Sequence, residues 1–323
     1  MENIDFKKYN SITNHYNVKV FKDLIARNYD LLPTTIEFEI TEKIHGANFS
    51  LLVEGTEDEI QFARRNDVLQ DDKFYGYKDV FDDTYIPLFD SIRRIANTYG
   101  TVQLYGELFG ENIQKGVYYG SKRFLWYALR INGHLVTTKE ADMLLEDIAY
   151  LKAPVIGHMV YDKTTDIKDF IESIPYRFTS RLTPSDYAEE NICEGVVAVP
   201  YDIIPLFGDT YFAIKKKNSE FLEKKSEKRV RLPKEVSEQV QDVLEEITTY
   251  VNSIRTDDLM SKLGELEDIR SIGQYASAYF EDVITDFTNE TDVYMSMSKE
   301  DQKEIKKKLS TLIFTELKRY LGA

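Results

Sequence analysis

The sequence predicts an α+β protein: a mainly antiparallel sheet in the first two thirds of the chain, then a smaller all-helical domain. Segments of alternating apolar and polar residues, many bounded by Gly, Asn and Asp, recur between residues 34 and 217. From Pro233 onward the apolar residues follow a helical period instead. Because 323 residues correspond to about two domains, we expect domains at 1–232 and 233–323.

The first domain is expected to contain strands, interrupted by helices. The strand-like segments are TTIEFEI (34–40), NFSLLVEG (48–55), EIQFARR (59–65), TVQLYGELFG (101–110), FLWYALRI (124–131), EGVVAVPY (194–201) and YFAIKKK (211–217). IPLFDSIRRIANTY (86–99) places Leu88, Ile92 and Ile95 on one helical face. TKEADMLLEDIAYL (138–151) predicts a second helix, with Thr138 as its N-cap.

The second domain is predicted from helical periodicity alone. Apolar residues recur every three or four positions from Val236 to Ile254 and again from Ile305 to Leu317. LMSKLGELEDI and IGQYASAYFEDVITDF lie between these two stretches. We therefore expect residues 235–323 to be helical throughout, without a β-barrel.

Several classes of protein are disfavoured by composition. No apolar run approaches the roughly 20 residues of a membrane helix, and the N-terminus lacks a signal-peptide pattern. Cys193 is the single cysteine, so no intrachain disulfide can form, and with four histidines it makes no dense zinc-ligand cluster. We expect a cytoplasmic protein with no membrane and no obligate protein partner.

The charge is unevenly distributed. A net charge of −15 and a pI of about 4.9 argue against a polyanionic partner. The strip 215–231 nevertheless holds eight basic and three acidic residues, and either binds phosphate or is a solvated loop. Residues 232–323 hold 11 basic and 19 acidic residues, so this part could bind a polyanion only through a local patch such as KEIKKKLS (303–310).

A lysine stands between two predicted strands. In EITEKIHGANFSLLVEG, Lys43 precedes Gly46 by three positions, and is either a surface turn residue or a placed amine. Charged residues at other strand ends are Glu107, Glu194, Lys215 and Lys217. Each of these residues, taken alone, could be a charged side chain at a strand end that faces water. Together they suggest a nucleophilic amine, two carboxylates for a divalent metal and two amines for a polyphosphate.

This set matches nucleotidyl transfer. A lysine amine can attack the α-phosphorus of a nucleotide and form a phosphoramidate. A free lysine amine has a pKa near 10.4, so it must lose its proton before it attacks. Neighbouring cations such as Lys215, Lys217 or a metal ion would stabilise the charge that develops on the phosphorus oxygens.

The same residues resemble a known family. TEKIHGANFSL is similar to the nucleotidyl motif of the RNA ligase 2 family, the phage nick-sealing RNA ligases related to the trypanosome RNA-editing ligases. LYGELFGENIQKGVYY, FLWYALRI, EGVVAVP and IKKKNSEF resemble its later blocks in the expected order. His45 stands where DNA ligases and capping enzymes usually carry aspartate. The resemblance implies an ATP-grasp-like ligase core built on an antiparallel sheet.

The resemblance also implies roles for individual residues. Lys43 would accept AMP, Glu194 would bind Mg²⁺ or Mn²⁺, and the aromatic ring of Tyr127 would lie against adenine. Arg65 would contact the nucleotide, with Arg64 as the alternative. The remaining ATP-site residues implied by the resemblance are Glu42, Ile44, His45, Asn48, Glu107, Lys215 and Lys217. His45 would act in strand joining or order the site, or would only pack in its turn.

Two residues depart from the family pattern. Ala128 follows Tyr127 where the family commonly has aspartate, so the position of the ring is open. Val199 stands where the family often has lysine, which leaves one phosphate or metal-water contact open. Trp126 and Tyr127 are neighbours in a strand, so only one is expected to face the site.

The resemblance implies an ATP-dependent RNA ligase. It would join 3′-hydroxyl and 5′-phosphate ends, at nicks in duplex RNA, through ligase-AMP and RNA-adenylate intermediates. A DNA ligase or capping guanylyltransferase is the enzymatic alternative, which the helical period after Lys217 disfavours because those enzymes carry a β-barrel there. The other class is a non-catalytic RNA-binding scaffold, which the intact set of charged residues disfavours.

Overall fold

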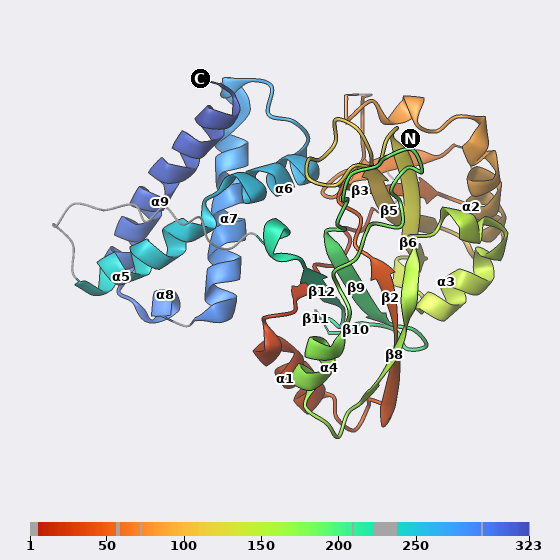
Figure 1. The fold of residues 1–323 in the computed structure, drawn as a ribbon, viewed down its shortest axis with the longest axis horizontal. Helices are drawn as coiled ribbons and strands as arrows, with labels where there is room; N and C mark the ends of the chain where they lie inside the picture. Colours follow the sequence, from red (N-terminus) through yellow and green to blue (C-terminus); the bar gives the residue numbers. More distant parts are fainter. Residues whose placement is uncertain are drawn as a thin grey trace. The chain divides into compact units, whose positions relative to one another are not determined.

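The computed structural model describes residues 6–55, 59–71, 73–208, 210–222, 238–291 and 293–322. The chain divides into one unit that ends at Glu220 and another that begins at Phe221. The first is mixed α+β and the second is helical in its described residues, as the sequence predicted (Figure 1). The expected domain boundary after residue 232 and most of the basic strip, from residue 223 on, lie outside the described residues.

Two five-stranded sheets form the first unit, in the part of the chain that the structure describes. Sheet A has the order β1-β12-β9-β2-β8 and sheet B the order β4-β3-β5-β6-β7. Within them, the described ladders are antiparallel except β1–β12. The strands are β1 (Thr13–Asn14), β2 (Thr35–Glu42), β3 (Ala47–Val53), β4 (Gln61–Arg64), β5 (Val102–Phe109), β6 (Arg123–Ile131), β7 (His134–Leu135), β8 (Val155–Asp162), β9 (Gly195–Pro200) and β12 (Ile214–Lys217). A separate hairpin pairs β10 (Leu206–Phe207) with β11 (Thr210–Tyr211).

The helices of this unit cover the outer faces of the sheets. They are α1 (Val18–Arg27), α2 (Ile86–Tyr99), α3 (Thr138–Leu144) and α4 (Ile167–Ser173), with 3-10 turns at Tyr77–Asp79, Asp83–Tyr85, Glu146–Leu151 and Ser219–Phe221. On sheet A, Phe38 and Ile40 of β2 pack with residues of α1 and α4, which lie together in Figure 1. On sheet B, Phe49 and Leu104 pack with residues of α2. Burial of these alternating apolar residues fixes which side chains face inward.

A cluster of tyrosines joins the inner faces of the two sheets. Tyr9, from the N-terminal segment, has its ring centroid 5.0 Å from that of Tyr105 and 5.1 Å from that of Tyr127. Its hydroxyl lies 2.9 Å from the Tyr211 hydroxyl. Val199 of β9 packs against the same cluster. The inner faces therefore meet around aromatic rings, and the charged site lies beyond this cluster.

Some predicted boundaries need correction. The N-cap of α3 is Thr137 and not Thr138, because Thr137 and Glu140 form a reciprocal capping box. The helix ends at Leu144, and the rest of the predicted segment is the 3-10 turn Glu146–Leu151. The prediction also omitted α1, β8 and α4.

The second unit is an assembly of helices around one apolar core in its described part. They are α5 (Glu238–Ile247), α6 (Ser253–Leu263), α7 (Ile272–Glu290), α8 (Val293–Ser296) and α9 (Lys299–Tyr320), with 3-10 turns at Thr248–Tyr250 and Ile269–Ser271. The predicted helix 236–254 is broken after Ile247, since Asn252 caps a new helix by accepting a hydrogen bond from Arg255 N. No described helix has the length and apolar character needed to cross a membrane.

Candidate active site

Lys43 lies directly after β2, at the point where the chain turns into β3. Its backbone N donates to the Gly195 carbonyl oxygen at 2.9 Å, which ties the break to the start of β9. Because Phe38 and Ile40 point into the outer core, odd-numbered residues such as Lys43 fall on the inner side. Gly46 completes the break: a Cβ there would overlap the Leu108 carbonyl oxygen, so a larger residue would displace β5.

Glu194 is the centre of the charged cluster. Its carboxylate is almost fully buried, at 1% exposure, and lies just before β9. Lys43 Nζ lies 2.6 Å and His45 Nδ1 lies 3.1 Å from Oε2, and Lys217 Nζ lies 3.0 Å from Oε1. Burial alone would raise the pKa of this carboxyl, but Lys43, Lys217 and His45 outweigh it and hold the pKa well below its usual range. Glu194 is therefore a carboxylate under ordinary conditions.

The backbone around Gly195 makes this cluster possible. Gly195 has φ +150°, and a Cβ would overlap the Lys216 carbonyl oxygen on the neighbouring strand. The register pairs Gly195 with Lys217 across β9 and β12. Only glycine lets the two strands approach this closely. Because Gly195 has no side chain, the side chains of Glu194 and Lys217 can come into contact.

The three consecutive lysines of β12 divide between two faces. Lys216 Nζ donates to the carbonyl oxygens of Ile171, Glu172 and Ile174 at 2.9, 2.9 and 2.8 Å, at the end of α4. Burial lowers the pKa of Lys216. Lys217 turns the other way, to Glu194, and Lys215 shares its face by the period of the strand. The structure thus assigns a structural contact to Lys216 and a place in the cluster to Lys217.

His45 contacts two other segments of the chain, one after β5 and one just before β9. Its backbone N donates to the Tyr119 hydroxyl at 2.9 Å. Its ring nitrogens face two acceptors, Glu194 Oε2 through Nδ1 and the Lys115 carbonyl oxygen at 2.9 Å through Nε2. Sequence reasoning did not single out Tyr119, although it belongs to the LYGELFGENIQKGVYY block.

Asn48, Glu107 and Tyr127 come together on the inner face of sheet B. Asn48 of β3 and Glu107 of β5 are direct partners in the ladder. Asn48 Nδ2 donates to the Tyr127 hydroxyl. Burial raises the pKa of this phenol well above its usual value, with Glu107 adding to the shift and Arg65 opposing it. These residues thus lie within electrostatic reach of one another.

A β-bulge in β6 directs Tyr127 to this face. The register shifts between Tyr105 and Gly106, which pair with Ala128 and Trp126 and leave Tyr127 as the extra residue. Trp126 packs into the outer core, and its indole N–H donates to the Ile148 carbonyl oxygen at 3.1 Å. Tyr127 and Ala128 both pack in the inner tyrosine cluster. The two large rings therefore lie on opposite faces of sheet B, with Tyr127 on the inner face.

Other predicted residues lie at the margin. Glu42 faces away from Lys43; its carboxylate accepts hydrogen bonds from the Ser180 hydroxyl and, at 2.8 Å, from Arg181 N. Burial raises the pKa of Glu42, and these two donors oppose the rise. Ile44 is buried at 4% exposure. Sequence reasoning missed Ser180 and Arg181, because no pattern links them to residue 42.

The two candidate arginines have different partners. Arg64 forms an ion pair with Asp67, three residues along the chain. Arg65 Nη2 donates to the Ser11 hydroxyl at 3.1 Å and lies close enough to Tyr127 to lower the pKa of that phenol. Proximity to Tyr127 therefore favours Arg65 over Arg64 as the arginine of the candidate site.

The cluster offers limited ligands for a metal. The described part of the chain has no group of three or more His, Cys, Asp or Glu side chains arranged to hold an ion. Glu194 alone supplies two buried carboxylate oxygens at the centre of the cluster. Oxygen donors of this kind suit Mg²⁺ and Mn²⁺, which retain several waters and share ligands with substrate phosphates. The donor chemistry thus fits a metal bound together with a nucleotide.

This fold and cluster are those of a nucleotidyltransferase, followed by a helical unit. The chain belongs to the RNA ligase family, whose model matches residues 36–215. The family model described as T4 RNA ligase 2 C-terminal matches residues 234–313.

The chain is also similar to solved structures of an RNA ligase from Naegleria gruberi. An apo mutant has 17% sequence identity and a TM-score of 0.48, and the alignment covers 68% of this chain and 58% of that one. A mutant described with ATP and Mn has 15% identity and a TM-score of 0.47, with 68% and 57% covered. A mutant described with AMP and Mn has 16% identity and a TM-score of 0.46, with 68% and 59% covered. The chain thus spans less than two thirds of the Naegleria chains.

Proposed function

We propose that this protein is an ATP-dependent RNA ligase that joins 3′-hydroxyl and 5′-phosphate ends at nicks in duplex RNA. The observation that carries the proposal is the contact of Lys43 and Lys217 with opposite oxygens of one buried carboxylate, Glu194. Membership of the RNA ligase family supports the substrate class.

In the first step, the Lys43 ammonium group loses a proton to solvent, and the neutral amine attacks the α-phosphorus of ATP and gives up a second proton to solvent as the phosphoramidate forms. A nitrogen–phosphorus bond forms, the bond from that phosphorus to the bridging oxygen breaks, and pyrophosphate leaves with its electron pair. Glu194 holds Lys43 Nζ by a 2.6 Å contact and so fixes the direction from which the amine approaches. Lys217, on the same carboxylate, places a positive charge where the phosphorus oxygens gain negative charge.

The second step takes place at the same α-phosphorus, and the third at the phosphorus of the RNA 5′-phosphate. An oxygen of the RNA 5′-phosphate attacks the lysyl-AMP, the nitrogen–phosphorus bond breaks and Lys43 regains its protons. The RNA 3′-hydroxyl then loses its proton and attacks the 5′-phosphorus, and AMP leaves as the phosphodiester forms. Splitting the condensation in this way replaces one difficult step by easier ones.

Residues on sheet B complete the proposed nucleotide site. The ring of Tyr127 faces adenine, and Asn48 orients it through the bond to its hydroxyl. Glu107, paired with Asn48 across the ladder, holds the ribose or a metal-bound water. Arg65 contacts the nucleotide, and Lys215 shares the phosphate face with Lys217. When bound at Glu194, Mg²⁺ or Mn²⁺ would neutralise charge on the phosphate oxygens.

The helical part is proposed to engage the RNA duplex. Its match to a ligase C-terminal model supports this role. The candidate basic segment is KEIKKKLS, in which Lys306, Lys307 and Lys308 are consecutive on α9. Lys306 Nζ lies 5.2 Å from the centre of the Phe280 ring, and Lys308 Nζ lies 3.7 Å from Glu304 Oε1. A local patch of this kind can contact phosphates even though residues 232–323 are acidic overall.

Two measurements test the proposal: which nucleotide forms a covalent adduct with the protein, and which RNA the protein then seals. The protein is incubated with radiolabelled ATP or GTP, and then with nicked duplex RNA beside single strands. A ligase forms an AMP adduct and seals the nicked duplex. A capping enzyme forms a GMP adduct instead, and a non-catalytic scaffold forms none. An AMP adduct with sealing only of single strands would contradict the proposed preference for nicks.

A further inference from the structure

A cavity of about 480 Å³ lies beside the Lys43 cluster. It is formed by the segment after β5, which carries Tyr118 and Tyr119, and by the segment before β9, which carries Arg181. Two of these residues also contact the active site. Tyr119 accepts the hydrogen bond from His45 N, and Arg181 N donates to Glu42. Tyr119 is therefore shared by the cavity and the candidate active site, and Arg181 connects the cavity to Glu42 at the margin of that site.

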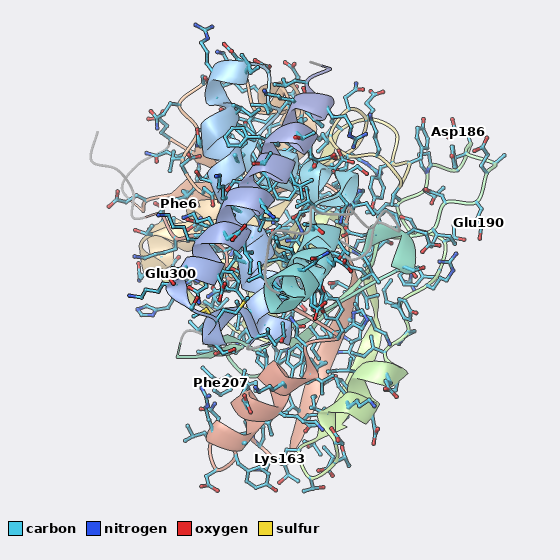
Figure 2. The ribbon with its side chains drawn as sticks, turned by 90° about the vertical axis from the view of Figure 1, so that its left-hand side faces the viewer. Phe6, Lys163, Asp186, Glu190, Phe207 and Glu300 are labelled. Carbon is cyan, nitrogen blue, oxygen red and sulfur yellow. The ribbon has the colours of Figure 1, made fainter. Side chains whose placement is uncertain are left out.

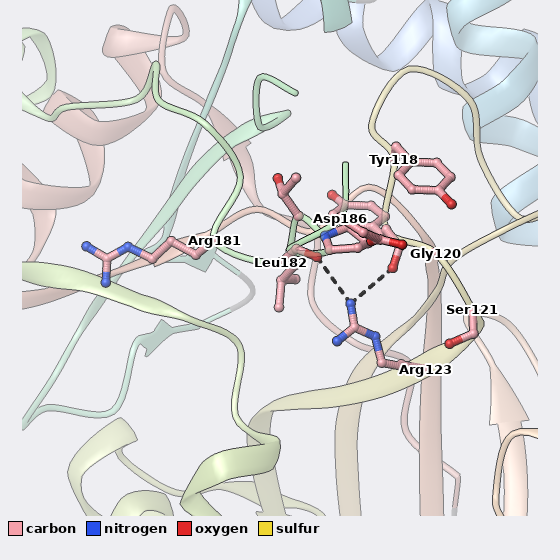
Figure 3. A pocket seen from close by; sticks show the side chains of 10 residues that line it. Tyr118, Gly120, Ser121, Arg123, Arg181, Leu182 and Asp186 are labelled. Atoms are coloured by element: carbon pink, nitrogen blue, oxygen red, sulfur yellow. Dashed lines mark hydrogen bonds between the residues drawn. The ribbon is translucent and has the colours of Figure 1, made fainter. Parts of the chain in front are cut away.

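Two side chains tie the walls together. Asn191, at 3% exposure, accepts from Tyr118 N at 2.8 Å and donates to the Tyr118 carbonyl oxygen at 2.7 Å. Arg123 Nη2 donates to one carbonyl oxygen in each segment, those of Tyr119 and Leu182, both at 3.2 Å (Figure 3). Walls fixed in this way need little reordering when a ligand binds.

An aromatic platform stands at one end of the cavity. The Tyr118 side chain is 47% exposed, and its ring is stacked on that of Tyr187, with centroids 4.5 Å apart and an angle of 23°. Tyr187 belongs to the segment that projects at the edge of Figure 2, between the labelled Asp186 and Glu190. A third ring, such as a nucleic acid base, can extend a stack of this kind.

A cation stands at the other end. Figure 3 shows Arg181 on the opposite side of the cavity from Tyr118, with its guanidinium group pointing away from the other lining side chains. The guanidinium group has five donors and suits phosphate, and Arg181 uses Nη1 to donate to the Val155 carbonyl oxygen at 3.0 Å. A stacking ring at one end and a cation beyond the other suit a base and the phosphodiester that leads away from it. Asp186, which also lines the cavity, offers acceptors for a ribose hydroxyl.

We propose that this cavity binds the terminal nucleotide of the RNA strand that carries the 5′-phosphate. Its base would stack on Tyr118, and the phosphodiester that follows it would face Arg181. The choice of strand rests on the proposed function, in which AMP passes from Lys43 to the 5′-phosphate. That phosphate must reach the Lys43 cluster, and the cavity is the adjoining space.

The kinetic test uses full-length Tyr118→Ala and Tyr118→Phe proteins. The matched control is Tyr150→Ala, which removes a 64% exposed tyrosine that does not line the cavity. Loss of one base–aromatic stack is expected to raise the KM for nicked RNA about tenfold in Tyr118→Ala. Adduct formation with ATP and the behaviour of Tyr118→Phe should match the unaltered protein. An unchanged KM, or an equal loss of adduct formation, would overturn the proposal.

A binding test is independent of ligase activity. Full-length Lys43→Ala protein is mixed with nicked RNA that carries 2-aminopurine as the first base of the 5′-phosphate strand. Stacking is expected to quench its fluorescence, and the added change Tyr118→Ala is expected to abolish the quenching. No difference between the two proteins, or quenching only at the last base of the 3′-hydroxyl strand, would contradict the proposal. If the unaltered protein forms no adduct, the proposed function fails while this measurement still reports on the cavity.

Discussion

At the residue scale, Glu194 determines whether the cluster holds together. A buried carboxylate is unfavourable on its own, and here Lys43, His45 and Lys217 compensate it. Glu194→Gln leaves the buried Lys217 ammonium without its carboxylate, so we expect the free energy of unfolding to fall by about 3 kcal/mol. Chemical denaturation measures this. Glu220→Gln, which removes an exposed partner of Arg177, is the control and should change little.

The ionised Glu194 carboxylate should also affect how the free energy of unfolding depends on pH. The pKa of Glu194 is lower in the folded protein than its ordinary value of 4.5. Below that value the unfolded chain binds a proton that the folded chain does not, so stability falls as pH decreases. We expect the unfolding free energy of the unaltered protein to fall more steeply below pH 4.5 than that of Glu194→Gln. Parallel curves for the two proteins would show that the cluster does not hold this carboxylate ionised.

Adjacent lysines provide a second residue-scale test. Lys217→Ala removes a cation from Glu194, and we expect lysine adenylation to slow about 100-fold or more, as for loss of other charge-stabilising groups. Lys216→Met should leave adenylation unchanged and lower the free energy of unfolding by about 1–3 kcal/mol, since its ammonium donates to three carbonyl oxygens. Adenylation rates and denaturation curves for both proteins separate the two roles. If Lys217→Ala and the unaltered protein are adenylated at equal rates, Lys217 is only a charged residue at the end of a strand.

At the element scale, the bulge in β6 gives two neighbouring residues different roles. Trp126 packs in the core, and Tyr127 is proposed to bind the nucleotide. Tyr127→Ala is expected to raise the KM for ATP in adenylation about tenfold, because one ring against adenine is lost. Trp126→Ala is expected to lower the free energy of unfolding by about 3–5 kcal/mol through a cavity in the outer core. If Tyr127→Ala leaves the KM unaltered, the ring does not face the nucleotide.

Elements with strong alternation were predictable, and those without it were not. TTIEFEI and TVQLYGELFG have one apolar face, so β2 and β5 were found, although β2 continues to Glu42. β8 is a half-exposed edge strand with Gly157 and His158 in it, and its pattern was too weak to recognise. The bulge at Tyr127 could not be read from FLWYALRI, because an extra residue is defined only against its partner strand.

The same limit applies to the site. Lys43 stood out from its position between two strands, and the period of β12 placed Lys215 and Lys217 on one face. The contact between Lys43 and Glu194 joins positions 151 apart and depends on the fold. The hydroxyl of Tyr119 and the backbone of Arg181 escaped prediction because their contacts also come from distant segments.

At the scale of the whole molecule, every residue assigned to the ATP reaction lies in the first unit. A chain ending at Leu232 should therefore fold, since about 230 residues can bury a sizeable core. It should still accept AMP from ATP but seal nicks poorly, because positioning of two ends supplies much of the rate. Adduct yield and nick sealing are compared with the full-length protein. Equal sealing would indicate that the helical part serves another purpose, such as binding a protein.

The covalent bond between Lys43 and AMP is the central claim. The most direct measurement is mass spectrometry of the intact protein and its peptides after incubation with ATP and Mg²⁺. We expect one added AMP, located on the peptide that contains Lys43, and no adduct on Lys43→Ala protein. An adduct on another residue, or one that persists in Lys43→Ala, would contradict the account.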